Sequence, residues 1–180
     1  LFGSKFLAII KMQVLLLSLV MISGLIFQIY KGFYDFEINL YIYELLALSL
    51  IYYVIWAFLA FFVQTLIPNP YLGLFIMIVL LIGIPLTQLA GIEQSIFKYN
   101  QGPGYSYSDM NAYGSSINRY FVYKTYWLCL GIVFFILTIL FYNRGLTSNF
   151  KERFKIAKNR FNGWHPFFLS VFTILFIAIG

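Results

Sequence analysis

Charged residues are scarce in this sequence, and that scarcity excludes an ordinary water-soluble domain. Lys, Arg, Asp and Glu make up 10% of the 180 residues, while hydrophobic residues make up 62%. Soluble domains usually carry about 25% charged residues. A soluble globule of this size could not bury so much apolar surface, which includes 21 Phe and 15 Tyr. We therefore predict an all-α integral membrane protein.

Residues that support catalysis are also scarce. Cys129 is the only cysteine, so no disulfide can form within the chain, and His165 is the only histidine. A zinc site would lack the companion ligands that it needs. The sequence contains none of the patterns HExxH, GxSxG or GxxxxGK[ST]. We expect no enzyme activity, cofactor or metal ion in these residues themselves.

Long apolar runs fill most of the chain. A helix of nineteen residues extends about 29 Å, which is close to the ~30 Å hydrocarbon core of a bilayer. Pro68 and Pro70 should end the second run, and Pro85 should kink or break the third near its end. We predict five spans, over residues 12–30, 43–66, 71–89, 123–142 and 164–180.

Positive charge gathers in the connection between the last two runs. The net charge is +6, and residues 143–163 hold six Lys or Arg against the single acid Glu152. Cytoplasmic loops carry an excess of Lys and Arg, so this connection is predicted to be cytoplasmic. Counting spans then puts the N-terminus inside and residues 90–122 outside. Because the positive charge lies beside a span, we expect anionic lipid as its partner and no nucleic acid.

The same connection has an amphipathic pattern. Phe150, Phe154, Ala157 and Phe161 recur at helical spacing and would share one face. This pattern is typical of a helix lying in the membrane interface, although a solvated charged linker is the alternative. The predicted membrane-surface contacts are Phe150, Lys151, Arg153, Phe154, Lys155, Lys158, Arg160 and Phe161.

Two carboxylates lie near predicted span ends, where charge is costly unless it is paired or hydrated. Glu44 and Asp109 either anchor the chain at the interface or take part in substrate passage. The polar stretch 90–122 either re-enters the membrane or lies along its surface. Because interrupted helices often line transport paths, the candidates for a path or outer gate are Glu44, Pro85, Tyr107, Asp109 and Gly114.

Several segments resemble a known family. They are residues 105–114 (YSYSDMNAYG), Tyr126-Trp127, Arg144-Gly145 and the basic run 151–160, and residues 34–41 and 64–73 also fit. They are similar to the membrane region of bacterial permeases of the second ABC exporter class. The resemblance is to the large kind that is fused to a zinc aminopeptidase similar to aminopeptidase N.

The resemblance implies a division of the chain. Residues 1–146 would be the last four spans of a permease half, with a re-entrant element within 90–122. Residues 147–163 would be a cytoplasmic connecting helix, and residues 164–180 the first span of the following half. Because residue 1 is Leu, we expect a fragment of a longer protein.

The resemblance also implies a function and partners. It implies export across the bacterial inner membrane, driven by ATP bound to a separate ABC ATPase subunit. A second permease half or a homodimeric copy would complete the assembly, and a zinc peptidase domain would lie outside these residues. The alternative is a membrane anchor for a tethered zinc aminopeptidase.

Overall fold

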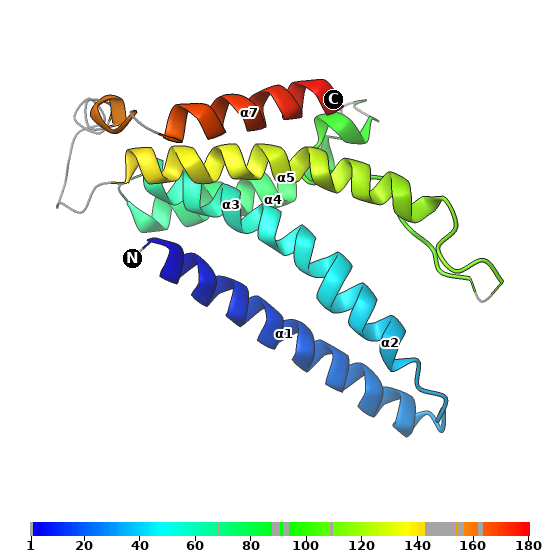
Figure 1. The fold of residues 1–180 in the computed structure, drawn as a ribbon. Helices are drawn as coiled ribbons and strands as arrows, with labels where there is room; N and C mark the ends of the chain where they lie inside the picture. Colours follow the sequence, from blue (N-terminus) through cyan, green and yellow to red (C-terminus); the bar gives the residue numbers. More distant parts are fainter. Residues whose placement is uncertain are drawn as a thin grey trace. The chain divides into compact units, whose positions relative to one another are not determined.

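The computed structural model describes residues 2–67, 69–87, 91, 94–108, 110–142, 154, 157–161 and 164–180. Within them the only β-pairing is an isolated bridge between Ser108 and Ala112, so the all-helical prediction is confirmed for the described residues. The elements are α1 (Phe2–Tyr30), α2 (Ile38–Tyr41), η1 (Ile42–Ser49), α3 (Leu50–Leu66), α4 (Pro70–Leu86), η2 (Ser95–Phe97), α5 (Ser116–Phe141) and α7 (Trp164–Ile179) (Figure 1).

Three of the described helical stretches are long and apolar enough to cross a membrane: Gly3–Tyr30, Ile38–Leu66 and Ser116–Phe141. Their apolar side chains face outward, as they would toward lipid. In α1, for example, Leu16 is 53% exposed and Phe27 is 62% exposed. The prediction of a membrane protein is therefore supported. The apolar helices α4 and α7 are shorter, and the count of five spans stays a prediction.

The second of these stretches begins with an unusual winding. Residues Ile42–Ser49 form a π-helix of eight residues between α2 and α3. The Ser49 hydroxyl donates a hydrogen bond of 2.9 Å to the carbonyl of Glu44, five residues earlier, which is the acceptor position of π winding. Such winding is rare, and it is frequently found at functional sites.

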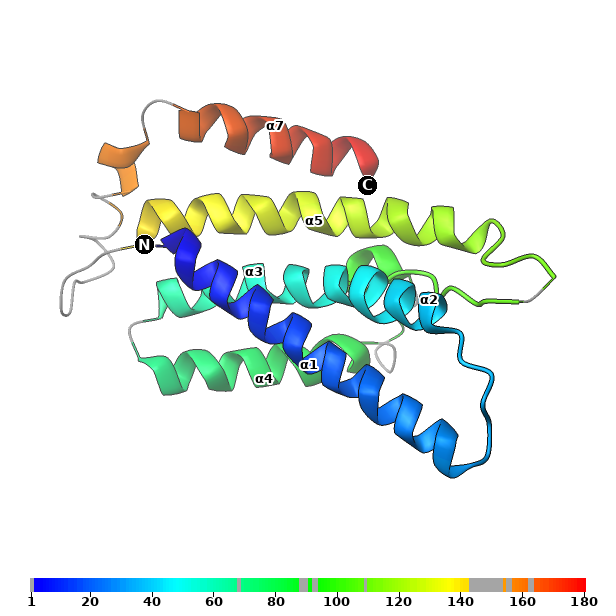
Figure 2. The same cartoon turned by 60° about the horizontal axis from the view of Figure 1, so that its bottom comes forward.

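The chain divides into two compact units, Leu1–Ala57 and Phe58–Gly180. In the first unit, α1 and the α2–η1 stretch form an antiparallel hairpin joined by residues 31–37 (Figure 2). The hairpin is closely packed, because a Cβ atom at Gly24 would lie 3.7 Å from the Tyr41 ring. The side-chain amide of Gln13 also donates to the Tyr53 carbonyl, at 3.4 Å.

The second unit is built around α5. The Phe62 ring of α3 stacks on Phe134 with centroids 4.8 Å apart. The helix α7 runs antiparallel to α5 (Figures 1 and 2), and Tyr126 stacks on Phe176 at 4.4 Å. Near the other end of α5, the buried residue Leu140 has neighbours on α7. These contacts make α5 the central helix of this unit.

The helix α4 follows the turn that the prolines predicted. Asn69 caps it by accepting a hydrogen bond from the Tyr71 backbone N–H at 3.0 Å, and Pro70 is its first residue. The helix ends at Leu86, one residue after Pro85, so the predicted break near its end is confirmed. Gln64 of α3 packs against Gly73 of α4, where a Cβ atom would lie 2.8 Å from the Gln64 Oε1.

The lone cysteine makes the predicted orientation testable. Cys129 is 4% exposed, so the parent chain should not react with a membrane-impermeant maleimide on intact cells. We expect Ser115→Cys to be labelled from outside and Lys158→Cys to be labelled only after the cells are permeabilised. Both positions are exposed, so access alone does not decide the result. The opposite labelling pattern would overturn the orientation.

Candidate functional site

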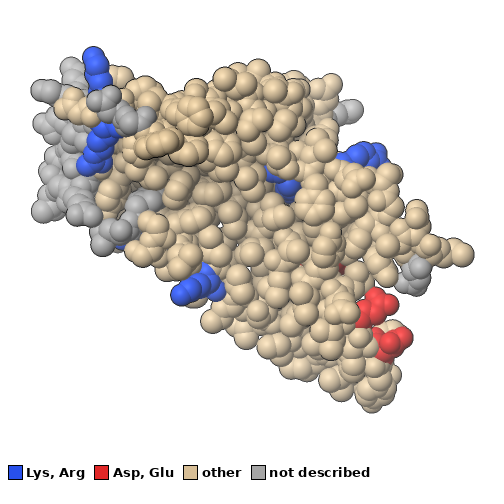
Figure 3. All heavy atoms as spheres, viewed as in Figure 1, with Lys and Arg blue, Asp and Glu red and all other residues tan. Residues whose placement is uncertain are grey.

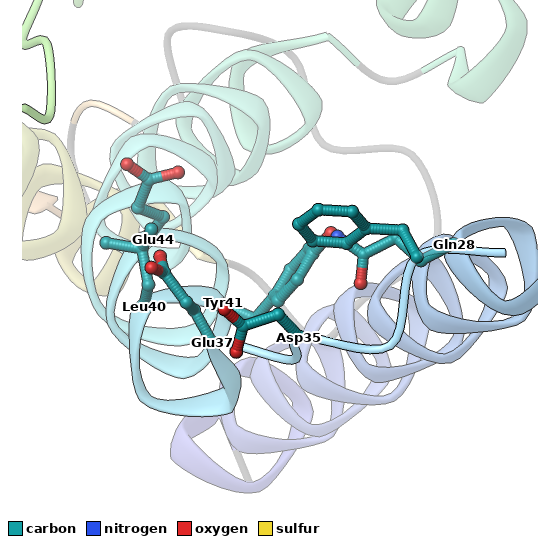
Figure 4. Close-up of a pocket in the computed structure, with 7 residues that line it drawn as sticks. Gln28, Asp35, Glu37, Leu40, Tyr41 and Glu44 are labelled. Carbon is teal, nitrogen blue, oxygen red and sulfur yellow. The ribbon is translucent and has the colours of Figure 1, made fainter. Parts of the chain in front are cut away.

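An acidic pocket lies at the closed end of the first hairpin (Figure 4). Its volume is about 360 Å³. Acidic side chains gather at this end of the hairpin (Figure 3), and Tyr41 reaches across the pocket toward the side chain of Gln28 (Figure 4). The lining residues are Gln28, Phe33, Asp35, Glu37, Leu40, Tyr41 and Glu44.

The end of α1 sets the shape of this pocket. Gly32 has a φ of +76°, a left-handed conformation that glycine adopts without strain. Its N–H donates to the Ile29 carbonyl at 2.9 Å, and the Phe33 N–H donates to the Gln28 carbonyl at 3.0 Å. This pair of bonds is a Schellman cap. The cap reverses the chain, so the residues that follow it turn back over Gln28.

The pocket contains one polar atom that has no partner. The Oε1 of Gln28 is buried and makes no hydrogen bond. Among the described residues, no group of three or more His, Cys, Asp or Glu is placed to hold a metal ion. Glu44 was predicted as a candidate, whereas Gln28, Asp35 and Glu37 were not recognised as its neighbours.

A second polar site includes a buried lysine of α5. Lys124 is 5% exposed, and its ammonium donates two hydrogen bonds of 2.8 Å, one to the backbone carbonyl and one to Oδ1 of Asn100. Asn100 is 1% exposed and has a φ of 60°, a conformation that Asn tolerates better than most residues. A third polar residue, Lys98, is 3% exposed. Lys124 and Asn100 therefore form a buried polar contact between α5 and the segment before it.

Aromatic side chains hold the same segment along α5. The Trp127 indole N–H donates to the Gln101 carbonyl at 2.9 Å. The Tyr99 ring lies edge-on to Trp127, with centroids 5.1 Å apart, and also contacts Phe134 at 6.2 Å.

These contacts place the segment at the depth of a candidate span. Phe134 is 18 residues beyond Ser116, the first residue of α5, which is about 27 Å along the helix. Lys124 is eight residues, or about 12 Å, from the same end. The segment around Tyr99 therefore lies beside the middle of α5 and not only beside its outer end. Whether the polar stretch re-enters the membrane or lies along its surface stays a prediction.

The sequence did not predict the buried contact between Lys124 and Asn100. The apolar run predicted a fourth span that starts at residue 123, with Lys124 at its outer edge. The helix begins at Ser116 instead, so Lys124 belongs to its third turn. The available signal was a lysine followed directly by apolar and aromatic residues, but nothing in the local pattern pointed to Asn100 as its partner.

The other candidates fall in different parts of the chain. Tyr107 packs edge-on against Tyr113, with centroids 5.3 Å apart, and Gly114 has a φ of +50° just before α5. These residues share one loop, in which Tyr105 also packs on Tyr120 at 5.0 Å. Pro85 ends α4, Glu44 belongs to the first unit, and Asp109 lies outside the described residues.

The basic connection is described in part. Residues 157–160 are helical, and Ala157 is 7% exposed in a cluster with Ile136 and Leu140 of α5. Phe154 and Phe161 are 59% and 48% exposed. The predicted apolar face therefore borders α5, while its interfacial position stays a prediction. The predicted contacts that lie outside the described residues are Phe150, Lys151, Arg153 and Lys155.

Comparisons with protein-family models, curated proteins and solved structures found no match.

Proposed function

We propose that this chain is part of the membrane domain of a permease of the second ABC exporter class, located in the bacterial inner membrane and driven by a separate ATPase. Three long apolar helices support a membrane location. The resemblance of residues 105–114 and of the basic run 151–160 to that family supports the class of transporter.

The contact between Lys124 and Asn100 is the observation that carries the proposal. Burying an ionisable side chain in a span is costly, and such residues commonly mark transport or proton pathways. A plain anchor needs only apolar helices. Here a polar segment is held against the third turn of α5 by an ammonium that donates two hydrogen bonds to Asn100. Interrupted polar elements of this kind are where transporters form their substrate paths.

The proposed mechanism moves α5 relative to its neighbours. ATP-driven closure of the partner subunit would act at the cytoplasmic end of α5, where the basic connection begins. The opposite end carries the aromatic loop with Tyr105, Tyr107 and Tyr113, which would serve as the outer gate. Gly114, in a left-handed conformation, would be its hinge. The segment at Asn100 would shift with α5 and change access to the path.

The test is coupling to an ATPase. The intact protein should co-purify with an ABC ATPase and raise its ATP turnover. Lys124→Met should lower that stimulation, because the segment at Asn100 loses both of its hydrogen bonds to the ammonium on α5. The matched control Lys31→Met removes an exposed lysine and should leave the stimulation unchanged.

The anchor function predicts a different outcome. If no ATPase co-purifies, and aminopeptidase activity of the parent protein survives exchange of these helices for an unrelated membrane anchor, the permease proposal is wrong. In that case the helices only tether an enzyme to the membrane.

A further inference from the structure

A groove of about 640 Å³ lies between the C-terminal end of α5 and the helical turn at residues 157–160. Its volume is within the range of pockets that hold organic ligands, roughly 300–1,000 Å³. All but one of its lining side chains are apolar, and the exception is a lysine. The lining residues are Leu137, Leu140, Phe141, Phe154, Ala157, Lys158 and Phe161.

The groove is open along one side. Ala157 forms part of its floor, at 7% exposure, whereas Phe154 and Phe161 on its walls are 59% and 48% exposed. The Phe141 and Phe154 rings lie 6.5 Å apart in a tilted arrangement, so they border the groove without closing it. The lining therefore suits an apolar occupant.

The charge beside the groove indicates what that occupant is. Lys158 is exposed at the groove, and residues 143–163 carry six Lys or Arg against one acid. Arg160 donates a hydrogen bond to the Tyr142 carbonyl at 2.5 Å, which ties the turn to the end of α5. The occupant should therefore carry negative charge near Lys158 and a hydrocarbon part between the aromatic walls.

The position of the groove along the helices agrees with a lipid. Trp164 begins α7 three residues after Phe161 and is 76% exposed. Trp is enriched at the level of the lipid headgroups, where its ring is partly apolar and its N–H is hydrated. The groove thus begins close to the headgroup level on the side predicted to be cytoplasmic. That leaflet is rich in anionic lipid.

We propose that this groove binds one acyl chain of an anionic phospholipid, with its phosphate at the Lys158 ammonium. The lipid would fill the space between α5 and the connection and hold the two together. This inference does not require the chain to be a permease, because a lipid site would serve an anchor equally well.

Native mass spectrometry of the full chain in neutral detergent tests the proposal. The protein is incubated with equal amounts of phosphatidylglycerol and phosphatidylcholine, and the lipid that stays bound as detergent is stripped away is measured. We expect one retained phosphatidylglycerol, at least tenfold preferred over phosphatidylcholine. Lys158→Gln should lower that preference about fivefold, as for the loss of one basic residue near an anionic surface. The control Lys11→Gln removes an exposed lysine of α1 and should change nothing.

Two further variants test the hydrocarbon part of the site. Ala157→Leu should fill the floor of the groove and abolish retention of either lipid. Phe154→Ser changes an exposed wall residue, so it should fold normally and still reduce retention. Glycerophosphoglycerol, which has the same headgroup but no acyl chains, should not compete. Equal retention of the two lipids by the parent chain, or undiminished phosphatidylglycerol on both groove variants, would overturn the proposal.

Discussion

Replacing Asn100 with leucine is expected to lower the free energy of unfolding by about 3 kcal/mol. Two losses add together in this variant. The buried Lys124 ammonium loses one of its two acceptors, and a hydrogen bond to a charged group contributes about 1.5–3 kcal/mol. Leucine must also adopt the φ of 60° at this position, and a left-handed conformation costs a residue with a Cβ atom roughly 1–2 kcal/mol.

Companion variants separate the two losses. Asn100→Gly relieves the backbone strain but still removes the side-chain acceptor. Its free energy of unfolding should therefore lie between that of the parent and that of the leucine variant. Asn100→Asp keeps an acceptor beside the ammonium and should stay within about 1 kcal/mol of the parent. Asn118→Leu is the surface control, because Asn118 is exposed on the first turns of α5.

Thermal unfolding in detergent measures these differences. For a chain of this length, 3 kcal/mol corresponds to a fall in Tm of roughly 6–12 °C. Hydrogen exchange should show that the protection lost in the leucine variant is greatest in residues 98–102. If Asn100→Leu unfolds at the parent temperature, the buried contact does not hold the segment to α5.

Replacing Gly131 with isoleucine should have the second large effect. A Cβ atom at this buried glycine would lie 2.7 Å from the Cδ2 atom of Phe58 and 3.4 Å from its Cγ atom. Real Cβ atoms essentially never approach that closely, so the helix α3 or the Phe58 ring must move. Overpacking of this kind costs about 1–3 kcal/mol. Small residues at helix contacts in membranes allow such close backbone approach.

Gly83 provides the matched control for that variant. It lies in α4, and a Cβ atom there would meet nothing within 4 Å. Gly83→Ile should therefore be neutral or slightly stabilising, since isoleucine has a better helix propensity than glycine by about 0.5 kcal/mol. Equal destabilisation at both sites would mean that the close approach to Phe58 does not decide the outcome. The two Tm values measured in one detergent give the answer.

The sequence predicted the helices better than it predicted their ends. Apolar runs and prolines reveal the part of a helix that is surrounded by lipid, and Pro85 lies in the last turn of α4, near the predicted end. Helical hydrogen bonding does not depend on apolarity, however. The helix α1 therefore starts at Phe2 and α5 at Ser116, several residues before the predicted spans, through Lys5 and Arg119.

The polar contacts were beyond the reach of local patterns. Asn100 and Lys124 are 24 residues apart, and their contact depends on how a loop folds onto a helix. Asp35 and Glu37 come near Glu44 only because Gly32 reverses the chain after α1. In the basic connection, the spacing of Phe154, Ala157 and Phe161 indicated an apolar face, but could not indicate that α5 would border it. Tertiary contacts of this kind leave no periodic signal.

The π-helix at Ile42–Ser49 gives the second long helix two ways to wind. In the π-helix each backbone N–H donates to the carbonyl five residues earlier. If these N–H groups donated instead to the carbonyls four residues earlier, as in an α-helix, the helix would stay continuous but become narrower and longer. Every side chain before the exchange point would then turn about the helix axis relative to α3. The Glu44 side chain would then point in a different direction from the helix axis, while the apolar side chains beyond Ser49 would keep their directions. The acidic end of the hairpin could thus be re-aimed by a change of hydrogen-bond pattern within one helix, without a loop having to open.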